Sequence, residues 1–363
     1  MTPVPIDRRT LIAATAAMAA VAAAGCASPS DAVRAAAAER RRPGALAHKG
    51  VNYDTERETW KLSYVRRDIK AIRRDLHCNA ILLLGSDVRR LMEAARLAAG
   101  EGLYVWIEAR QFEQTPERTL EFLTEIGRAA EKLRRRHPKV GISVGCELTI
   151  FMQGLVPGAD WMERGANLSK PISNGYNERL NAFLPKAVKT TREVFGGKLT
   201  YSSGEWEKVV WTDFDIVGVD LYRDAKNEAT YVRQVRELHS HGKPVFITEF
   251  GCCTYKGAEK RGGEGFMGVI DEDPPPPRVK PGFVRDERVQ AEHIGELLDI
   301  YEAEGVSGAF VYNFSSPDTP HTDDPLYDQD IASHCIVKVR SDYARTGRWE
   351  PKLAFHTLAR RYA

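Results

Sequence analysis

The stretch Lys243-Pro-Val-Phe-Ile-Thr-Glu-Phe-Gly251 is the segment from which the fold of this chain is best inferred. Its apolar, β-branched run is too short for a helix and is bounded by Pro244 and Gly251, which is typical of a buried parallel strand. A carboxylate, Glu249, stands where this strand ends. A charge there is costly unless it is paired or used, and catalytic groups of β/α barrels lie at the C-terminal ends of strands. Glu249 is therefore either a catalytic residue or a side chain that simply leaves the core for solvent.

The chain on both sides of this stretch alternates short apolar segments with amphipathic ones, which predicts parallel β/α units. Eight strands are expected, at 49–53, 80–84, 103–107, 140–144, 199–201, 215–219, 245–248 and 308–312. Helices are expected between the strands, and a closing helix at 351–362. A single (β/α)8 TIM barrel without a second domain would then account for residues 45–363.

The overall composition excludes several classes of function. The chain has 52 basic and 50 acidic residues, which give a formal net charge of only +2. It has no basic stripe with interleaved aromatic residues, so a nucleic-acid partner is not expected. It also has no G-x-S-x-G nucleophile elbow and no glycine-rich phosphate loop, which argues against Ser-His-Asp catalysis and nucleotide binding.

The first 44 residues are predicted to be a leader and not part of the barrel. Arg8-Arg9 is a twin-arginine pair, and the apolar run at 11–24 has the length of a signal peptide core. The run ends in Ala23-Ala24-Gly25-Cys26, which resembles a bacterial lipobox. Residues 1–26 would then be a signal peptide with Cys26 as the lipidation site, and 27–44 a tether. This predicts an exported protein of the cell envelope, held to the membrane only by an N-terminal lipid anchor, or a secreted protein if cleavage occurs without lipidation.

Two groups of residues that often bind metal ions are not expected to do so here. The five cysteines beyond Cys26 have neither a disulfide framework nor zinc spacing, and most of them are predicted to be buried small hydrophobes. The acids in the long segment after the eighth strand do not match the EF-hand pattern, so we expect a solvated loop and no calcium site. These acids are Asp318, Asp323, Asp324, Asp328 and Asp330.

A second carboxylate, Glu147, follows the fourth strand about 100 residues before Glu249. Strands four and seven of an eight-stranded barrel face each other across its mouth, so the two side chains are expected to converge. Glycoside hydrolysis needs such a pair, with one neutral acid for the leaving oxygen and one anion for the anomeric carbon. Proximity and burial should raise the pKa of one carboxyl group and leave the other ionised.

Three stretches carry a resemblance to a known group of enzymes. Ile247-Thr-Glu-Phe-Gly251, Asp215-Ile-Val-Gly-Val-Asp-Leu-Tyr222 and Trp349-Glu-Pro-Lys-Leu-Ala-Phe355 resemble the large clan of retaining glycoside hydrolases. The run Gly145-Cys146-Glu147-Leu148 loosely resembles the endo-mannanase-type barrels of that clan. The resemblance extends over 48–362. It implies that Glu249 is the nucleophile, that Glu147 is the acid/base, and that Tyr222 contacts the nucleophile.

Four positions depart from that clan's pattern. Cys146 stands where most members have an Asn that binds the sugar 2-hydroxyl, although some mannanase-type members lack it. Gly85 ends the second strand, where an Arg that holds the nucleophile is common. Tyr312 and Phe314 lie where a sugar-stacking Trp is usual. These departures bear on the substrate class and on activity itself.

Residues at other strand ends are expected to line the substrate cleft. Trp206 is predicted to be a sugar platform, since an aromatic face packs on the apolar face of a pyranose, and a core Trp is the alternative. Glu205 beside it is an alternative acid. The predicted substrate-binding residues are Asn52, Arg110, Trp206, Tyr222 and Tyr312.

The predicted function is that of an exported glycoside hydrolase that cleaves a β-linked oligo- or polysaccharide by a retaining two-carboxylate mechanism, without a cofactor. A mannan is the first candidate substrate. The alternative is a catalytically inactive barrel lipoprotein that binds glycan or cell-wall material. A third interpretation, a protein of the kind labelled abortive infection, conflicts with the leader because that role lies in the cytoplasm.

Overall fold

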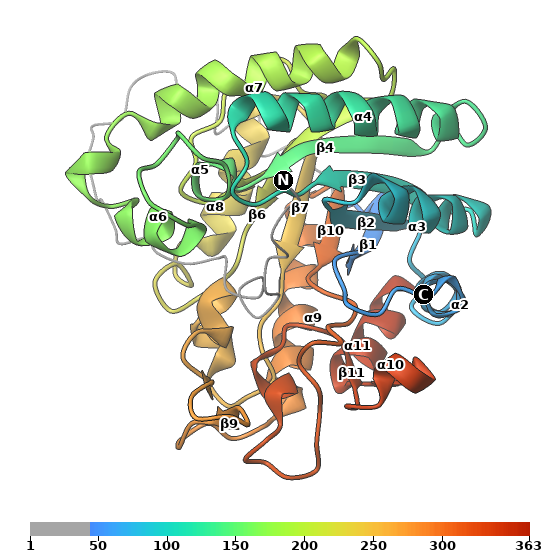
Figure 1. Cartoon of the computed structure of the whole chain (residues 1–363), viewed down its shortest axis with the longest axis vertical. Helices are drawn as coiled ribbons and strands as arrows, with labels where there is room; N and C mark the ends of the chain where they lie inside the picture. Colours follow the sequence, from blue (N-terminus) through green and yellow to red (C-terminus); the bar gives the residue numbers. More distant parts are fainter. Residues whose placement is uncertain (1–43) are drawn as a thin grey trace.

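The computed structural model of the protein describes residues 44–363 (Figure 1). The predicted signal peptide, the lipobox with Cys26 and the tether up to residue 43 lie outside the described residues. Among the helices of 44–363, none has both the length and the apolar character that crossing a membrane requires.

Eight parallel strands close into a barrel in the order β1-β10-β7-β6-β5-β4-β3-β2. They are β1 (His48–Asp54), β2 (Ala80–Gly85), β3 (Tyr104–Ala109), β4 (Val140–Cys146), β5 (Lys198–Gly204), β6 (Val217–Asp220), β7 (Val245–Phe250) and β10 (Gly308–Val311). Each expected strand is present, with bounds that differ from the predicted ones by a few residues. The predicted (β/α)8 barrel is therefore confirmed, and β4 and β7 lie three strands apart around it.

The helices that cover the barrel follow from amphipathic patterns with recognisable ends. The longest, for example, begins where the Thr115 hydroxyl accepts from the Arg118 amide and Pro116 occupies the first position. The main helices are α2 (Leu62–Arg74), α3 (Val88–Gly100), α4 (Pro116–Arg134), α7 (Tyr176–Arg192), α8 (Tyr231–Leu238), α9 (Glu287–Ala303) and α11 (Leu353–Tyr362).

Short elements occupy the connections. The short helices are α5 (Leu148–Phe151), α6 (Trp161–Asn167) and α10 (Tyr343–Thr346), and the short strands pair as β8 (Ile270–Asp271) with β9 (Arg278–Val279) and β11 (Val337–Val339) with β12 (Trp349–Pro351). The 3-10 turns are η2 (Pro171–Ser173), η3 (His239–His241), η4 (Ala258–Lys260), η5 (Gly262–Phe266) and η6 (Gln329–Ala332).

The acidic segment after β10 is not a solvated loop throughout, so that expectation is wrong for two of its five acids. Asp328 and Asp330 are buried, and both pair with Arg285 at 3.0 and 2.9 Å. Asp330 also pairs with buried Lys352 at 2.8 Å, and Asp328 meets His321 at 2.8 Å. Buried carboxylates need such partners, and these ion pairs tie the segment to the barrel.

The N-terminal half of the barrel interior is filled by aromatic and aliphatic side chains. Trp106, Phe246 and Phe310 belong to this cluster and are buried, so the indole of Trp106 is part of the core. Gly141 makes room for the indole, since a Cβ there would lie 2.4 Å from the Trp106 ring. The five described cysteines are also buried and free, as predicted. The barrel interior is thus packed with apolar side chains in its N-terminal half, and the polar groups lie at its C-terminal end.

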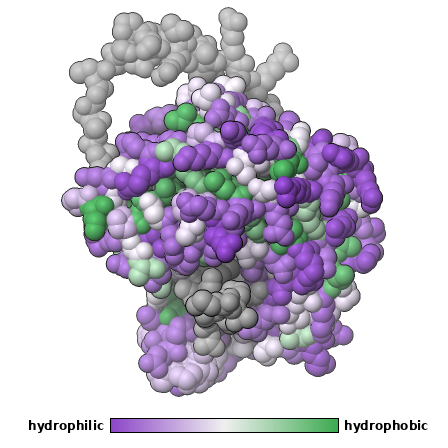
Figure 2. All heavy atoms as spheres, turned by 45° about the horizontal axis from the view of Figure 1, so that its top comes forward, coloured by the Kyte–Doolittle hydropathy of each residue, from purple (hydrophilic) through white to green (hydrophobic). Residues whose placement is uncertain are grey.

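The face of the molecule shown in Figure 2 is mainly hydrophilic. On the face shown in Figure 2, hydrophobic residues form separate small groups within a hydrophilic surface, and no broad apolar patch is visible. Residues such as Met162, Ile172 and Val210 are exposed singly, which is normal for a folded domain.

Candidate active site

Glu147 follows β4 directly and is held in an unusual backbone conformation. Its φ of 43° and ψ of 45° lie in the left-handed region, which residues with a Cβ seldom adopt. Its amide donates to the Ser202 carbonyl at 2.9 Å, and its own carbonyl accepts from the Ile150 amide at 3.0 Å. The turn from strand into α5 therefore fixes where the Glu147 side chain points.

The carboxyl group of Glu147 is buried without a partner. Glu147 is only 1% exposed, and neither of its carboxyl oxygens has a hydrogen-bond partner among the described residues. Desolvation raises the pKa of Glu147 well above its usual value, and the nearby carboxyls of Asp220 and Glu249 raise it further. Glu147 is therefore suited to be a neutral carboxylic acid at neutral pH.

Glu249, on β7, has the opposite environment. The guanidinium of Arg110 forms an ion pair and a hydrogen bond with its Oε1, and the hydroxyl of Tyr222 donates to its Oε2 at 2.9 Å. Both oxygens are thus engaged by donors, which suits an anion held in a defined orientation.

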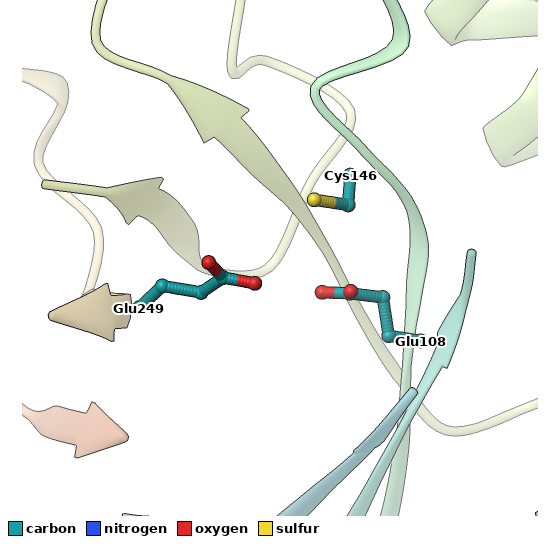
Figure 3. Close-up of side chains that lie close together, drawn as sticks. All are labelled: Glu108, Cys146 and Glu249. Carbon is teal, nitrogen blue, oxygen red and sulfur yellow. The ribbon is translucent and has the colours of Figure 1, made fainter. Parts of the chain in front are cut away.

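Arg110 supplies the positive charge at the centre of this cluster. Glu108, Cys146 and Glu249 point toward one another from β3, β4 and β7 (Figure 3), and one ligand-type atom from each lies within 4.8 Å of the others. Such a set could bind a metal ion. However, the Arg110 guanidinium contacts all three, with Glu108 Oε1 at 2.8 Å and Cys146 Sγ at 3.1 Å, and so neutralises the charge a metal would otherwise meet.

The glycine that ends β2 lies next to Arg110 and is closely packed against Thr55. The Arg110 amide donates to the Gly85 carbonyl at 3.1 Å, so Arg110 enters the site from the neighbouring strand at the same level. A Cβ on Gly85 would lie 2.1 Å from the Thr55 hydroxyl, which leaves no room for a side chain there. Strand two thus supplies no arginine to this site, and the guanidinium paired with Glu249 comes from Arg110, which directly follows β3.

Cys146 and Asp220 form a second layer around the two catalytic candidates. The Cys146 thiol donates to Asp220 Oδ2 at 3.3 Å, and the Thr248 hydroxyl donates to Oδ1 at 2.7 Å. Burial raises the pKa of both Cys146 and Asp220 well above their usual values. The thiol that stands in place of an Asn is therefore a neutral hydrogen-bond donor inside the protein.

The remaining predicted residues lie at different places around the mouth. Asn52 is fully buried and donates from Nδ2 to the Thr248 carbonyl at 3.1 Å, while its Oδ1 has no partner among the described residues. Tyr312 is half-buried, and the Arg110 guanidinium lies over its ring, 5.9 Å from the ring centre. Tyr312 also lines a cavity of about 40 Å³ together with Asp54 and Ser315. The structure thus gathers Arg110, Tyr222 and Tyr312 around Glu249.

Trp206 lies on the other side of Glu147 and is largely enclosed. It is 9% exposed, packs with Phe151 and Trp161 in one cluster, and donates from its indole nitrogen to the Thr149 hydroxyl at 2.9 Å. Glu205 beside it is exposed. Trp206 therefore packs against α5, through Phe151, and is mostly shielded from solvent.

Three buried acids of the site were missed as candidates, namely Glu108, Asp220 and Glu207. Alternation along β3 could have revealed Glu108, because residues two apart share a face and Trp106 points into the barrel. Asp220 likewise is a carboxylate at the end of an otherwise apolar strand, and Glu249 has a similar place, one residue before the end of β7. Glu207 follows β5 in an irregular turn, and no periodicity distinguishes it from exposed Glu205.

Comparison with known proteins places the fold among those of glycoside hydrolases. No family model matches the sequence, and no curated protein sequence matches it. A solved GH113 β-1,4-mannanase aligns with a TM-score of 0.58 at 12% identity, over 87% of this chain and 99% of the mannanase. A GH113 β-mannanase from Alicyclobacillus acidocaldarius gives 0.54 at 15% identity, over 88% and 98%. A glycoside hydrolase family 5 enzyme from Prevotella bryantii B14 gives 0.52 at 11%, over 88% and 97%. The resemblance to the retaining clan is confirmed at the level of the fold.

Proposed function

We propose that this protein is an exported retaining glycoside hydrolase that cleaves a β-linked glycan. The observation that carries the proposal is the asymmetry of the two carboxyl groups at the barrel mouth. Glu147 is buried, unpartnered and favoured in its neutral form, while Glu249 is paired with Arg110 and Tyr222. Double displacement needs one acid and one anionic nucleophile in these two states.

The proposed reaction has two steps. In the first, a Glu249 oxygen attacks the anomeric carbon while Glu147 gives its proton to the departing glycosidic oxygen, which forms a glycosyl ester and releases the aglycone. In the second, the Glu147 carboxylate takes a proton from water, whose oxygen attacks the anomeric carbon and frees Glu249. Arg110 and Tyr222 orient the nucleophile in the first step and stabilise it again as it leaves in the second.

The proposed substrate is a β-linked polysaccharide, with β-1,4-mannan first. Two of the similar structures are named β-mannanases, and this chain has Cys146 in place of the Asn that some mannanase-type members of the clan also lack. We also propose export and lipid anchoring through Cys26, on the sequence of the leader alone.

A substrate panel with a stereochemical readout tests the proposal. The purified protein is incubated with aryl β-glycosides and with mannan, glucan and xylan, and the first-formed anomer is identified by proton NMR. Release of the β-anomer supports a retaining mechanism, and the α-anomer would contradict it. Glu249→Gln should lower turnover by about 10⁴-fold or more, as expected when a covalent nucleophile is lost.

A glycan-binding barrel without turnover is the second candidate. It is favoured by the enclosed position of Trp206 and by Cys146 in place of the usual Asn. In that case, calorimetry would detect glycan binding while no substrate is cleaved, and Glu249→Gln would leave the binding unchanged.

A further inference from the structure

Glu207 lies behind the candidate acid Glu147, in a buried position that the proposed reaction does not use. It follows β5, is 8% exposed, and has all its acceptor capacity filled. Its Oε1 accepts from the Thr149 amide at 3.0 Å and from the Thr149 hydroxyl at 2.6 Å. Its Oε2 accepts from the Tyr201 hydroxyl at 2.7 Å and from the Gly204 amide at 3.1 Å. Four donors on one carboxylate describe an anion that is fully satisfied.

Two of these donors, the amide and the hydroxyl of Thr149, belong to the turn that presents Glu147. The Leu148 amide donates to the Tyr201 hydroxyl at 2.7 Å, and the Thr149 amide donates to Glu207. The first two amides after Glu147 are therefore held by Tyr201 and Glu207, which reach them from β5 and the turn after it. The indole of Trp206 completes the network on the Thr149 hydroxyl.

The network matters because Glu147 adopts the left-handed backbone region. Such a conformation costs about 1–2 kcal/mol for a residue with a Cβ and persists only where surrounding contacts impose it. The amide contacts to Tyr201 and Glu207 impose it from one side, and the bond to the Ser202 carbonyl from the other.

We infer that Glu207 is a positioning residue for the acid/base role of Glu147, acting through the backbone of Leu148 and Thr149. This inference rests on the proposed function, because it concerns the acid of that reaction. Charge adds to the geometry. Burial raises the pKa of Glu207 to about 6 against the lowering effect of its Thr149 hydrogen bonds, so Glu207 is mainly ionised at neutral pH. Its negative charge in turn helps to raise the pKa of Glu147.

The test separates acid catalysis from general damage by the choice of leaving group. In Glu207→Gln, the amide NH₂ would face donors from Tyr201 and Gly204, so the network cannot be satisfied. We expect kcat/KM for the polysaccharide to fall about tenfold or more, because its leaving oxygen needs a proton. For a 2,4-dinitrophenyl β-glycoside, whose leaving group needs none, kcat/KM should change less than about twofold while kcat falls. Equal losses of kcat/KM on both substrates, or no loss on either, would overturn the inference.

Matched variants keep the test valid if Glu207→Gln does not fold. Thr149→Val removes the hydroxyl that donates to Glu207, whereas Thr149→Ser retains it. We expect the polysaccharide-specific loss in the Val variant only. Glu193→Gln, an exposed change at the end of α7, is the control for loss of a carboxylate and should match the wild type. The same loss in the Val and Ser variants would contradict the role of the network.

A titration without substrate distinguishes failure of this inference from failure of the proposed function. Carbon-13 NMR of labelled Glu side chains, with Glu147 assigned by its Gln variant, reports the protonation of Glu147 directly. Glu207→Gln should shift that titration to lower pH, because a negative neighbour is removed. An unchanged midpoint would overturn the inference even if the wild type cleaves no glycan of the panel.

Discussion

At the end of β7, Glu249 accepts from a guanidinium and a tyrosine hydroxyl, whereas at the end of β4 the same functional group, in Glu147, accepts from nothing among the described residues. Both carboxyls are buried, so burial alone does not distinguish them. The difference lies in the donors that each strand end brings. The barrel thus prepares one carboxyl group to be an anion and the other to be an acid before any substrate is bound.

The largest expected effect comes from removing the acid itself. Glu147→Gln should lower kcat/KM for a polysaccharide by about 10²–10⁴-fold, the usual contribution of general acid catalysis. A dinitrophenyl glycoside should retain most of its kcat/KM, and azide should restore kcat by attacking the glycosyl ester without a base. Steady-state kinetics with and without azide measure both effects. Equal losses on the two substrates would show that Glu147 is not the acid.

Removing Arg110, the cation paired with Glu249, should destabilise the folded protein as well as disturb the nucleophile. Arg110→Met leaves Glu108 and Glu249 buried without their shared partner, and such a change costs about 3–5 kcal/mol. Urea unfolding at neutral pH measures it. The control is Arg118→Met, which removes an exposed pair with Glu121 and should cost less than about 1 kcal/mol. Similar losses in both variants would mean that the Arg110 cluster is no special source of stability.

A smaller effect is expected when only the hydroxyl on Glu249 is removed. Tyr222→Phe deletes one hydrogen bond to a charged group, which is worth about 1.5–3 kcal/mol, so kcat/KM should fall about 10–100-fold. Tyr64→Phe, whose hydroxyl donates to the Arg345 carbonyl on the surface, should stay within about twofold of the wild type. If kcat/KM of Tyr222→Phe is unchanged, the hydroxyl does not stabilise the nucleophile.

The smallest effect should be a gain in stability at the unpartnered carboxyl. Folding raises the pKa of the Glu147 carboxyl group. Between its unfolded and its folded pKa, the folded state therefore binds more protons than the unfolded state, and the stability of the protein falls as the pH rises through this range. The Glu147→Gln variant has no carboxyl group at this position and therefore does not lose this stability as the pH rises. It should be more stable than the wild type by about 1–2 kcal/mol at pH 8, and the difference should shrink toward pH 4. Urea unfolding at both pH values checks the sign, and a less stable variant at pH 8 would contradict it.

The barrel was predictable because its strands and helices are local patterns. Strand ends follow directly from those patterns, so Glu147, Glu249 and Tyr222 could be placed at one end of the barrel. The partners of each group were not predictable in the same way. Arg110 was expected to face the substrate, yet it pairs with Glu249, because the residue that directly follows β3 lies at the level of the end of β2 and reaches across to β7.

The burial of side chains in irregular segments could not be predicted from hydrophobic periodicity. Glu207 is one of two acids that flank Trp206, and only the course of the turn after β5 decides which one is buried. Asp328 and Asp330 depend on Arg285 and Lys352, which are distant in sequence and carry no local signal of pairing. Long-range partners of this kind need coordinates.

The seam between β1 and β10 has a consequence for how the molecule acquires its structure. The Lys49 ammonium donates to the Tyr362 carbonyl, 313 residues away, and the Tyr362 hydroxyl donates to the Gly50 carbonyl. During synthesis, β1 therefore cannot pair with its neighbour β10 or be covered by α11 until these later parts of the chain have been made. Contacts of such separation form slowly, so ring closure is a late event.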